Sequence, residues 1–269
     1  MKFYLITSNP KVSAYAIDSG VDSIFVDIET LGKAERQKNL NLHLTSHTFT
    51  DIKNIRKAIS EGSEIVVRLN PLNQNSESEF NVALLNGASR IMFPMIRSVN
   101  DFIAITKINS GRCPIVYLIE TKEALQSIEL WIKFVRVNDR VHFGLNDLSL
   151  SYNMKFLFTP LALGLLDYAA SIMRQSKIQF GIGGISRIGQ GLINPNLILS
   201  EHVRLGSSWV ILSRSFHGGS SEDYDLFKKN DLKSEILKIK DAYKTASNLS
   251  TDILESNHQK LKNECMKYS

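Results

Sequence analysis

Short apolar runs rich in β-branched and aromatic residues recur along the chain, and most are followed by a stretch with helical spacing. We expect eight of these runs to form strands: FYLIT from Phe3, SIFVDIE from Ser23, EIVVRLN from Glu64, RIMFPMI from Arg90, PIVYLIE from Pro114, RVHFGLN from Arg140, IQFGIGG from Ile178 and SSWVILS from Ser207. Nearly continuous apolar runs of this kind are typical of parallel strands that are buried on both faces.

Between the strands, apolar residues spaced three and four apart predict amphipathic helices. The clearest stretches are DIKNIRKAISEG, NDFIAITKI, TKEALQSIELWIKFV, LALGLLDYAASIMRQS and PNLILSEHVRLG. Eight consecutive β-then-α units predict an α/β protein with a (β/α)8 TIM barrel. A doubly wound sheet is the alternative, because the strand count from sequence is uncertain by roughly one or two.

A Lys-rich region follows the eighth expected strand. Its two segments, LKSEILKIKDAY and LSTDILESNHQKLKNECM, each place apolar residues on one helix face. We therefore expect a barrel over residues 1–227 and a C-terminal helical extension over residues 228–269 that packs on the barrel or on a neighbouring subunit of a homo-oligomer. The extension lacks the interleaved aromatic residues that base stacking needs, which disfavours nucleic-acid binding.

The composition is that of a globular protein, with 43% hydrophobic and 22% charged residues. The net charge of +5 arises from basic residues interleaved with acidic ones, so it favours small anionic substrates over nucleic acid. Cys113 and Cys265 show no metal-ligand spacing and are expected to be reduced thiols. The apolar run at the N-terminus is too short for a signal peptide or a membrane span. We expect a cytoplasmic protein without membrane contact.

The carboxyl ends of the strands carry the functional residues in barrels of this kind. The expected strands end in Asp27 and Glu29, Arg68 and Asn70, Glu120, Asn146 and Asp147, and the glycines Gly183 and Gly184. Acids at one rim would raise each other's pKa unless a cation lay among them. Glu120 and Asp147 offer oxygen ligands without Cys or His beside them, which favours Mg²⁺ or Mn²⁺ over Zn²⁺. Taken alone, Asp147 could instead cap the following helix.

Arg68 adds a planar guanidinium that suits a carboxylate or an enolate oxygen. A divalent cation and an arginine can together stabilise the negative charge of an enolate. No lysine closes any of the expected strands, which argues against a covalent imine.

Five motifs in order resemble a known family: DIE after the second strand, VRLNP after the third, FPMI in the fourth, IET after the fifth and GLNDLS after the sixth. From about Asp22 to Phe216, the chain is similar to the citrate lyase β-chain and HpcH/HpaI aldolase superfamily. The resemblance implies a barrel that binds Mg²⁺ or Mn²⁺ through Glu120 and Asp147, with Arg68 contacting the oxo acid. It also implies a lyase that makes or breaks a carbon–carbon bond by way of an enolate of pyruvate or of an acyl thioester.

The chain departs from the family pattern at the expected base. Thr30 stands where the aldolase branch has a histidine, and where the citrate lyase branch usually has a second acid after Glu29. The candidates for the base are Glu29, a metal-bound water, and His47 from the polar loop LGKAERQKNLNLHLTSHTFT, which also contains His43. That loop either folds over the mouth of the barrel or is a solvated surface loop. In the fourth strand, Met95 replaces the lysine typical of the thioester branch.

The glycine-rich stretch FGIGGISRIGQG follows the seventh strand. Loops at this position often bind phosphate, and Arg187 and Arg214 are near enough to add positive charge. The alternative is that the glycines only let the backbone pass close to an oxo acid. We expect Arg68, Asn146, Gly183 and Gly184 to bind the substrate, and Glu201 and His202 to be structural.

The favoured hypothesis is a divalent-metal-dependent lyase or aldolase that acts on a small anionic 2-oxo acid, or on a citrate-lyase-like, phosphorylated or thioester substrate. One alternative is a phosphate-binding barrel isomerase or synthase that needs no metal. The other is a barrel that binds a ligand without catalysis.

Overall fold

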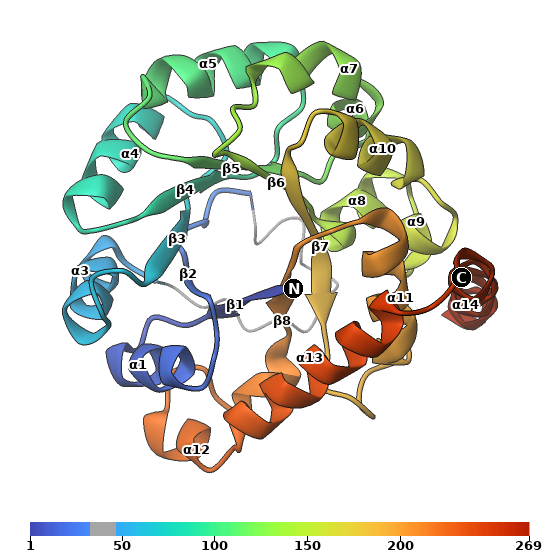
Figure 1. Ribbon diagram of the computed structural model, residues 1–269. Helices are drawn as coiled ribbons and strands as arrows, with labels where there is room; N and C mark the ends of the chain where they lie inside the picture. Colours follow the sequence, from blue (N-terminus) through green and yellow to red (C-terminus); the bar gives the residue numbers. More distant parts are fainter. Residues whose placement is uncertain (33–46, 269) are drawn as a thin grey trace.

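The chain forms a closed barrel of eight parallel strands in sequence order, which the computed structural model describes for residues 1–32 and 47–268 (Figure 1). The strands are β1 (Lys2–Ile6), β2 (Ser23–Asp27), β3 (Glu64–Arg68), β4 (Arg90–Phe93), β5 (Ile115–Ile119), β6 (Arg140–Phe143), β7 (Gln179–Ile185) and β8 (Trp209–Leu212). The prediction of a (β/α)8 barrel is confirmed, and closure of the sheet excludes the doubly wound alternative.

Helices surround the barrel and alternate with the strands along the chain (Figure 1). They are α1 (Pro10–Asp18), α3 (Phe49–Ala58), α4 (Ser76–Leu85), α5 (Val99–Asn109), α6 (Lys122–Gln126), α7 (Ile128–Trp131), η1 (Ile132–Phe134), α8 (Leu145–Ser151), α9 (Thr159–Ala162), α10 (Asp167–Gln175), α11 (Pro195–Leu205), η2 (Arg214–His217), α12 (Tyr224–Lys228), α13 (Leu232–Ser247), α14 (Thr251–Cys265) and η3 (Met266–Tyr268). Thr48 and Asp51 form a capping box that fixes the start of α3.

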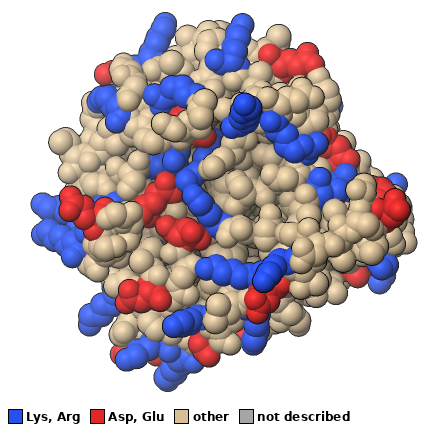
Figure 2. All heavy atoms as spheres, viewed as in Figure 1, with Lys and Arg blue, Asp and Glu red and all other residues tan. Residues whose placement is uncertain are grey.

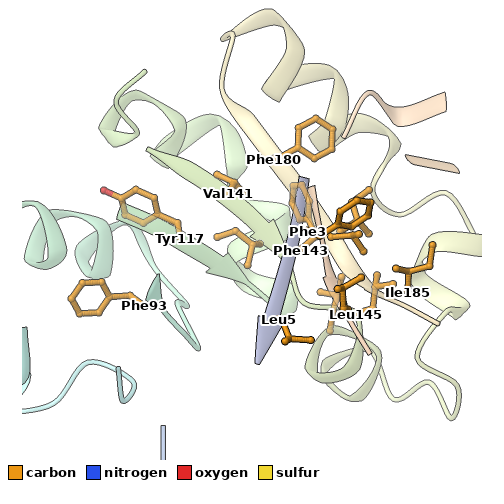
Figure 3. Packing of buried hydrophobic residues seen from close by; sticks show 14 of the residues in the cluster. Phe3, Leu5, Phe93, Tyr117, Val141, Phe143, Leu145, Phe180 and Ile185 are labelled. Atoms are coloured by element: carbon orange, nitrogen blue, oxygen red, sulfur yellow. The ribbon is translucent and has the colours of Figure 1, made fainter. Parts of the chain in front are cut away.

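Two apolar layers hold the barrel together. The outer layer lies between the strands and the helices and includes Phe3, Val141 and Phe180 (Figure 3). The inner layer fills the barrel with side chains from alternate strand positions: Tyr4, Phe25, Val66, Met92, Val116, Leu118 and Trp209. Because these side chains fill the middle of the barrel, open space remains only toward its ends.

Charged side chains close the amino end of the barrel. Glu64 at the start of β3 contacts Arg90 at 3.1 Å and Arg140 at 2.7 Å. Burial alone would raise the pKa of Glu64, but Arg140 and Arg90 outweigh burial and lower this pKa to about 2. Figure 2, seen from the same side as Figure 1, shows acidic and basic side chains interleaved over this face. The amino end of the barrel is therefore filled by acidic and basic side chains that pair with one another.

The last helices pack on the barrel through α11 and the end of α1. Ile236 and Lys240 of α13 lie against Gly20, where a Cβ atom would be 3.6 Å and 3.5 Å from them. Figure 1 shows α13 crossing between α12 and α11, with α14 outside α11. Glu201 of α11 accepts hydrogen bonds from Arg204 and lies 3.1 Å from His258 of α14. The domain boundary at residue 227 stays a prediction. In the described part of the chain, no helix has the length and apolarity needed to cross a membrane.

Several elements end at other residues than the sequence predicts. The strand expected from Arg140 stops at Phe143, and α8 begins at Leu145, so Asn146 and Asp147 lie in the first turn of a helix and not at the end of the strand. The strand expected from Arg90 stops at Phe93, before a proline that cannot donate a ladder hydrogen bond. The helix expected over residues 121–135 is divided at Ser127 into α6, α7 and η1.

Gly181→Ala is expected to destabilise the barrel, because a Cβ atom at Gly181 would lie 2.5 Å from the Trp209 ring and 2.7 Å from its carbonyl oxygen. Overpacking of this kind typically costs about 1–3 kcal/mol. Urea denaturation measures the loss in the free energy of unfolding. Gly62→Ala is the control, because nothing lies within 4 Å of the added atom there. Equal stability of the two variants would contradict this account of the barrel interior.

Candidate functional site

A cavity of about 360 Å³ opens at the carboxyl ends of the strands. Its lining includes Arg68, Glu120, His142, Asn146, Asp147, Gly183, Gly184, Ser213, Arg214 and His217. Ligand pockets usually measure about 300–1,000 Å³, so this one suits a small molecule. A larger cavity, of about 500 Å³, lies between α11, α13 and α14, away from the strand ends. The cavity that contains Arg68, Glu120 and Asp147 is therefore the candidate site.

Arg68 at the end of β3 is held by the two acids that follow β2. Its Nε and Nη2 donate to the two carboxylate oxygens of Asp27, at 2.9 Å and 2.8 Å, and Nε lies 3.3 Å from Glu29. Burial by itself would lower the pKa of Arg68, but Asp27 and Glu29 outweigh it and raise this pKa. The Nη1 atom takes no part in these contacts. Arg68 is thus a fixed, permanently charged group in the cavity wall.

Glu120 lies directly after β5 and is almost fully buried. Its Oε1 accepts a hydrogen bond of 2.9 Å from the backbone N–H of Met95. Met95 has a φ of 54°, a left-handed conformation that is costly for a side chain of this type. Gly144 at the end of β6 makes room for the carboxylate, because a Cβ atom there would lie 2.7 Å from its Oε2. The backbone at Met95 and the absence of a side chain at Gly144 thus both accommodate the Glu120 carboxylate.

Glu120 and Asp147 are close enough for their charges to interact. Burial is the main cause that raises the pKa of Glu120 to about 8, the charge of Asp147 raises it further, and Arg68 opposes both. Asp147 is half-buried in the first turn of α8, where a helix favours a negative charge. A cation between the two carboxylates would relieve their repulsion.

The two carboxylates fit a cation that takes part of its coordination from water and substrate. Among residues 1–32 and 47–268, no group of three or more His, Cys, Asp or Glu side chains could hold a metal ion. Mg²⁺ is typically bound through only one or two carboxylates, and the remaining positions go to water and ligand oxygens. The pair therefore suits Mg²⁺ or Mn²⁺ and lacks the ligands of a closed zinc site.

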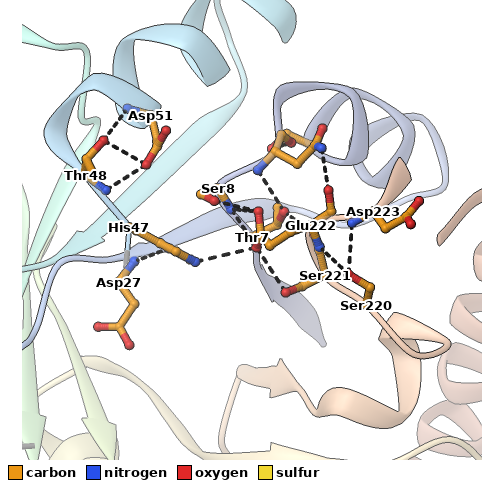
Figure 4. A network of polar contacts seen from close by, with 12 residues as sticks. Thr7, Ser8, Asp27, His47, Thr48, Asp51, Ser220, Ser221, Glu222 and Asp223 are labelled. Carbon is orange, nitrogen blue, oxygen red and sulfur yellow. Dashed lines mark hydrogen bonds and ion pairs between the residues drawn. The ribbon is translucent and has the colours of Figure 1, made fainter. Parts of the chain in front are cut away.

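Asn70 and His47 hold the chain around β2. The side-chain oxygen of Asn70 accepts hydrogen bonds from the backbone N–H groups of Thr30 and Leu31, at 2.8 Å and 2.9 Å. His47 Nδ1 accepts a hydrogen bond of 3.0 Å from the backbone N–H of Asp27 (Figure 4). Both residues therefore position backbone next to the two acids that hold Arg68.

The other ring nitrogen of His47, Nε2, lies 3.6 Å from Glu222. Glu222 also accepts hydrogen bonds from the backbone and the hydroxyl group of Ser8, so the segment after β8 is tied to the end of β1 (Figure 4). His47 is not part of the cavity lining formed by the described residues. His43 lies outside the described residues.

The HpcH/HpaI aldolase/citrate lyase family matches residues 1–178 of the 269. The chain belongs to this family. No curated protein matches the chain at a significant level. Membership supports lyase or aldolase activity on a small molecule, and the family is generally dependent on a divalent metal.

The family match includes the cavity residues that follow β3, β5 and β6, but it ends before β7 and β8. Arg68, Glu120 and Asp147 lie within residues 1–178. The glycines of β7 and Arg214 of η2 lie beyond that range, although the same cavity contains them. The half of the cavity formed by β7 and β8 is therefore not defined by the family match.

The two histidines in the cavity lining were not predicted as site residues from the sequence. His142 lies within β6, and burial is the main cause that lowers its pKa to about 3. His217 lies at the end of η2, and burial is again the main cause that lowers its pKa, to about 4. Both imidazoles are therefore neutral at pH 7. The alternation of strand residues could have indicated His142, because it is two positions before Gly144 on the inward face of β6.

Glu120→Gln is expected to stabilise the metal-free protein at neutral pH. The pKa of Glu120 rises from an ordinary 4.5 to about 8 on folding, so between these values the folded state binds a proton that the unfolded state has lost. Stability of the wild type should therefore fall as the pH rises through this range, and the uncharged amide should remove that contribution. Thermal unfolding in a chelator across the same range measures the difference.

Glu123→Gln, at an exposed position in α6, is the control for the loss of one carboxylate. Mg²⁺ should raise the unfolding temperature of the wild type and of this control, because a ligand that binds only the folded state stabilises it. The same pH slope in Glu120→Gln as in the wild type would contradict the electrostatic description of the site.

Proposed function

We propose that the protein is a divalent-metal-dependent carbon–carbon lyase or aldolase that acts on a 2-oxo acid through a pyruvate-type enolate. The observation that carries this proposal is the convergence of Glu120, Asp147 and Arg68 on one cavity of small-molecule size. Two acids can hold a cation, and the arginine can hold the anionic substrate beside it. Membership of an aldolase and lyase family supports the reaction class.

Glu120 and Asp147 are the residues that would hold Mg²⁺ or Mn²⁺. When bound, the ion supplies positive charge to the oxygen on which negative charge develops as the substrate loses a proton. The protein's own contribution at these positions is rigidity. The Met95 N–H fixes one oxygen of Glu120, and the first turn of α8 fixes Asp147.

Arg68 binds the carboxylate or the enolate oxygen of the substrate. Its orientation is fixed before the substrate arrives, because Asp27 engages two of its nitrogens and Glu29 approaches one of them. A group that is already oriented needs no reorganisation during the reaction, and this is the main source of electrostatic catalysis. Loss of Asp27 would therefore free Arg68 to adopt other rotamers.

We assign the proton transfer to Glu29 in preference to His47. Glu29 contacts Arg68, which lines the cavity, whereas both ring nitrogens of His47 face Asp27 and Glu222. His47 is then a positioning residue that holds the backbone of Asp27. Thr30, where the aldolase branch has its histidine, instead binds Asn70 through its backbone.

The opposite side of the cavity suits the rest of an anionic substrate. Gly183 and Gly184 keep this wall free of side chains, and a Cβ atom at Gly183 would lie 2.7 Å from Leu145. Arg214 brings a positive charge to the same wall, and Asn146 adds an amide. These residues would hold a carboxylate, a phosphate or the polar end of a thioester substrate.

We further propose that the protein works in the cytoplasm as a homo-oligomer. The C-terminal helices support the second point, because they expose the apolar side chains of Leu237, Ile253 and Met266, at 51%, 47% and 57%. A subunit interface that includes α13, α14 and η3 would cover these side chains.

Exchange of the methyl protons of pyruvate in D₂O, followed by NMR, tests this function without knowledge of the second substrate. We expect exchange with Mg²⁺ or Mn²⁺ and its loss in a chelator. Asp147→Ala should lose the exchange but retain the fold, because Asp147 is only half-buried at the rim. Asp252→Ala, at an exposed position in α14, is the matched control.

Exchange that persists in Asp147→Ala would show that the metal site is assigned wrongly. Substrate turnover that is unaffected by the chelator would favour a metal-free, phosphate-binding isomerase or synthase. Ligand binding without any turnover would favour a non-catalytic barrel.

A further inference from the structure

His142 forms the floor of the cavity. Successive inward positions of β6 are Arg140, His142 and Gly144, because side chains alternate along a strand. Arg140 belongs to the ion cluster at the amino end. Gly144 carries no side chain, and Glu120 occupies the space above it. His142 is therefore the last inward side chain of β6 below the cavity, and it is part of the cavity lining.

The surroundings of the His142 ring are mostly apolar. The ring lies over Trp209, with 4.3 Å between the ring centroids and 30° between the planes. Leu118 is its neighbour on β5, and His142 is only 2% exposed. Its Nδ1 atom is enclosed, with no hydrogen-bond partner among the described residues. A core residue that only filled space would not need an imidazole at this position.

Nε2 is the ring nitrogen that can reach a ligand in the cavity, because Nδ1 is enclosed. A buried N–H without a partner is rarer in proteins than an acceptor without one. The favoured tautomer therefore carries its proton on Nε2 and leaves only a lone pair on Nδ1. The result is an N–H donor directed at the cavity and supported by the Trp209 ring.

The donor is uncharged at pH 7, because burial, together with His202 and Arg68, keeps the pKa of His142 far below that of an ordinary histidine. A neutral donor does not repel a divalent cation at Glu120 and Asp147, as an imidazolium would. It can nevertheless strengthen its hydrogen bond when an acceptor oxygen gains negative charge.

We infer that His142 is a further catalytic residue, whose Nε2–H donates a hydrogen bond to the substrate oxygen that becomes negative when the enolate forms. This role rests on the proposed function. Two strand positions separate His142 from Gly144, about 7 Å at 3.3–3.4 Å per residue, and Glu120 packs against Gly144. A small oxo acid that lies between the level of His142 and the level of Gly144 can contact both the His142 ring and Glu120.

His142→Phe tests the role, because phenylalanine keeps a ring against Trp209 and removes the N–H. Removal of a single donor of this kind typically lowers the rate by roughly 10²–10³-fold, and we expect such a loss in pyruvate proton exchange. His142→Gln keeps an amide N–H and should recover part of the rate. This rescue separates the chemical role from a loss of packing.

Binding of oxalate gives a second readout that does not depend on turnover. Oxalate is a planar dianion that resembles the enolate of pyruvate, and an enolate analogue reports interactions that form late in the reaction. His142→Phe should weaken oxalate binding more than pyruvate binding, both measured by calorimetry with Mg²⁺ present. His258→Gln, at a buried histidine between α14 and α11, should leave the ratio of the two affinities unchanged.

The outcomes separate this role from the proposed function. One outcome is that the wild type exchanges the pyruvate protons and that His142→Phe has the same exchange rate and the same ratio of oxalate to pyruvate affinity. This outcome would overturn the role of His142 and leave the proposed function standing. Absence of metal-dependent exchange in the wild type would overturn both. A selective loss in His142→Phe with partial recovery in His142→Gln would support the inference.

Discussion

The burial of Glu120 beside Asp147 is the constraint on which the site depends. Burial and a neighbouring negative charge both disfavour the ionised form of Glu120, and Arg68 only partly compensates. The surrounding backbone nevertheless accommodates this carboxylate: Met95 adopts a left-handed conformation to donate its N–H, and Gly144 omits a side chain to leave room. A fold that only had to be stable would gain from an uncharged residue here. The arrangement makes sense if the two carboxylates share a cation.

Arg68 connects this acidic pair to the rest of the barrel. Asp27 and Glu29 fix its guanidinium. His47 fixes the backbone of Asp27, and Glu222 joins His47 to the end of β1 (Figure 4). The cavity wall is thus supported by β2, by the chain before α3 and by the segment after β8. A change at Glu222 would reach Arg68 through this series of contacts.

The fold and the acidic rim were predictable from the sequence because strand periodicity identifies the strand ends, and parallel strands bring those ends together. The boundary between β6 and α8 was not predictable, because a short apolar run such as the one around Phe143 has the same pattern in a strand and at a helix start. The placement of His47 depends on contacts with residues distant in sequence, such as Glu222. His142 was overlooked because it lies inside an apolar strand, where only its inward position in the strand alternation could have indicated it.

Binding of Mn²⁺, followed by electron paramagnetic resonance, tests the central claim most directly, because it requires neither substrate nor turnover. Wild-type protein should bind the ion at one site, and oxalate should alter the spectrum of the bound ion. Glu120→Gln and Asp147→Asn should each weaken this binding strongly, since each removes one of the two charged ligands. Undiminished binding in both variants would contradict the account and place any metal site elsewhere.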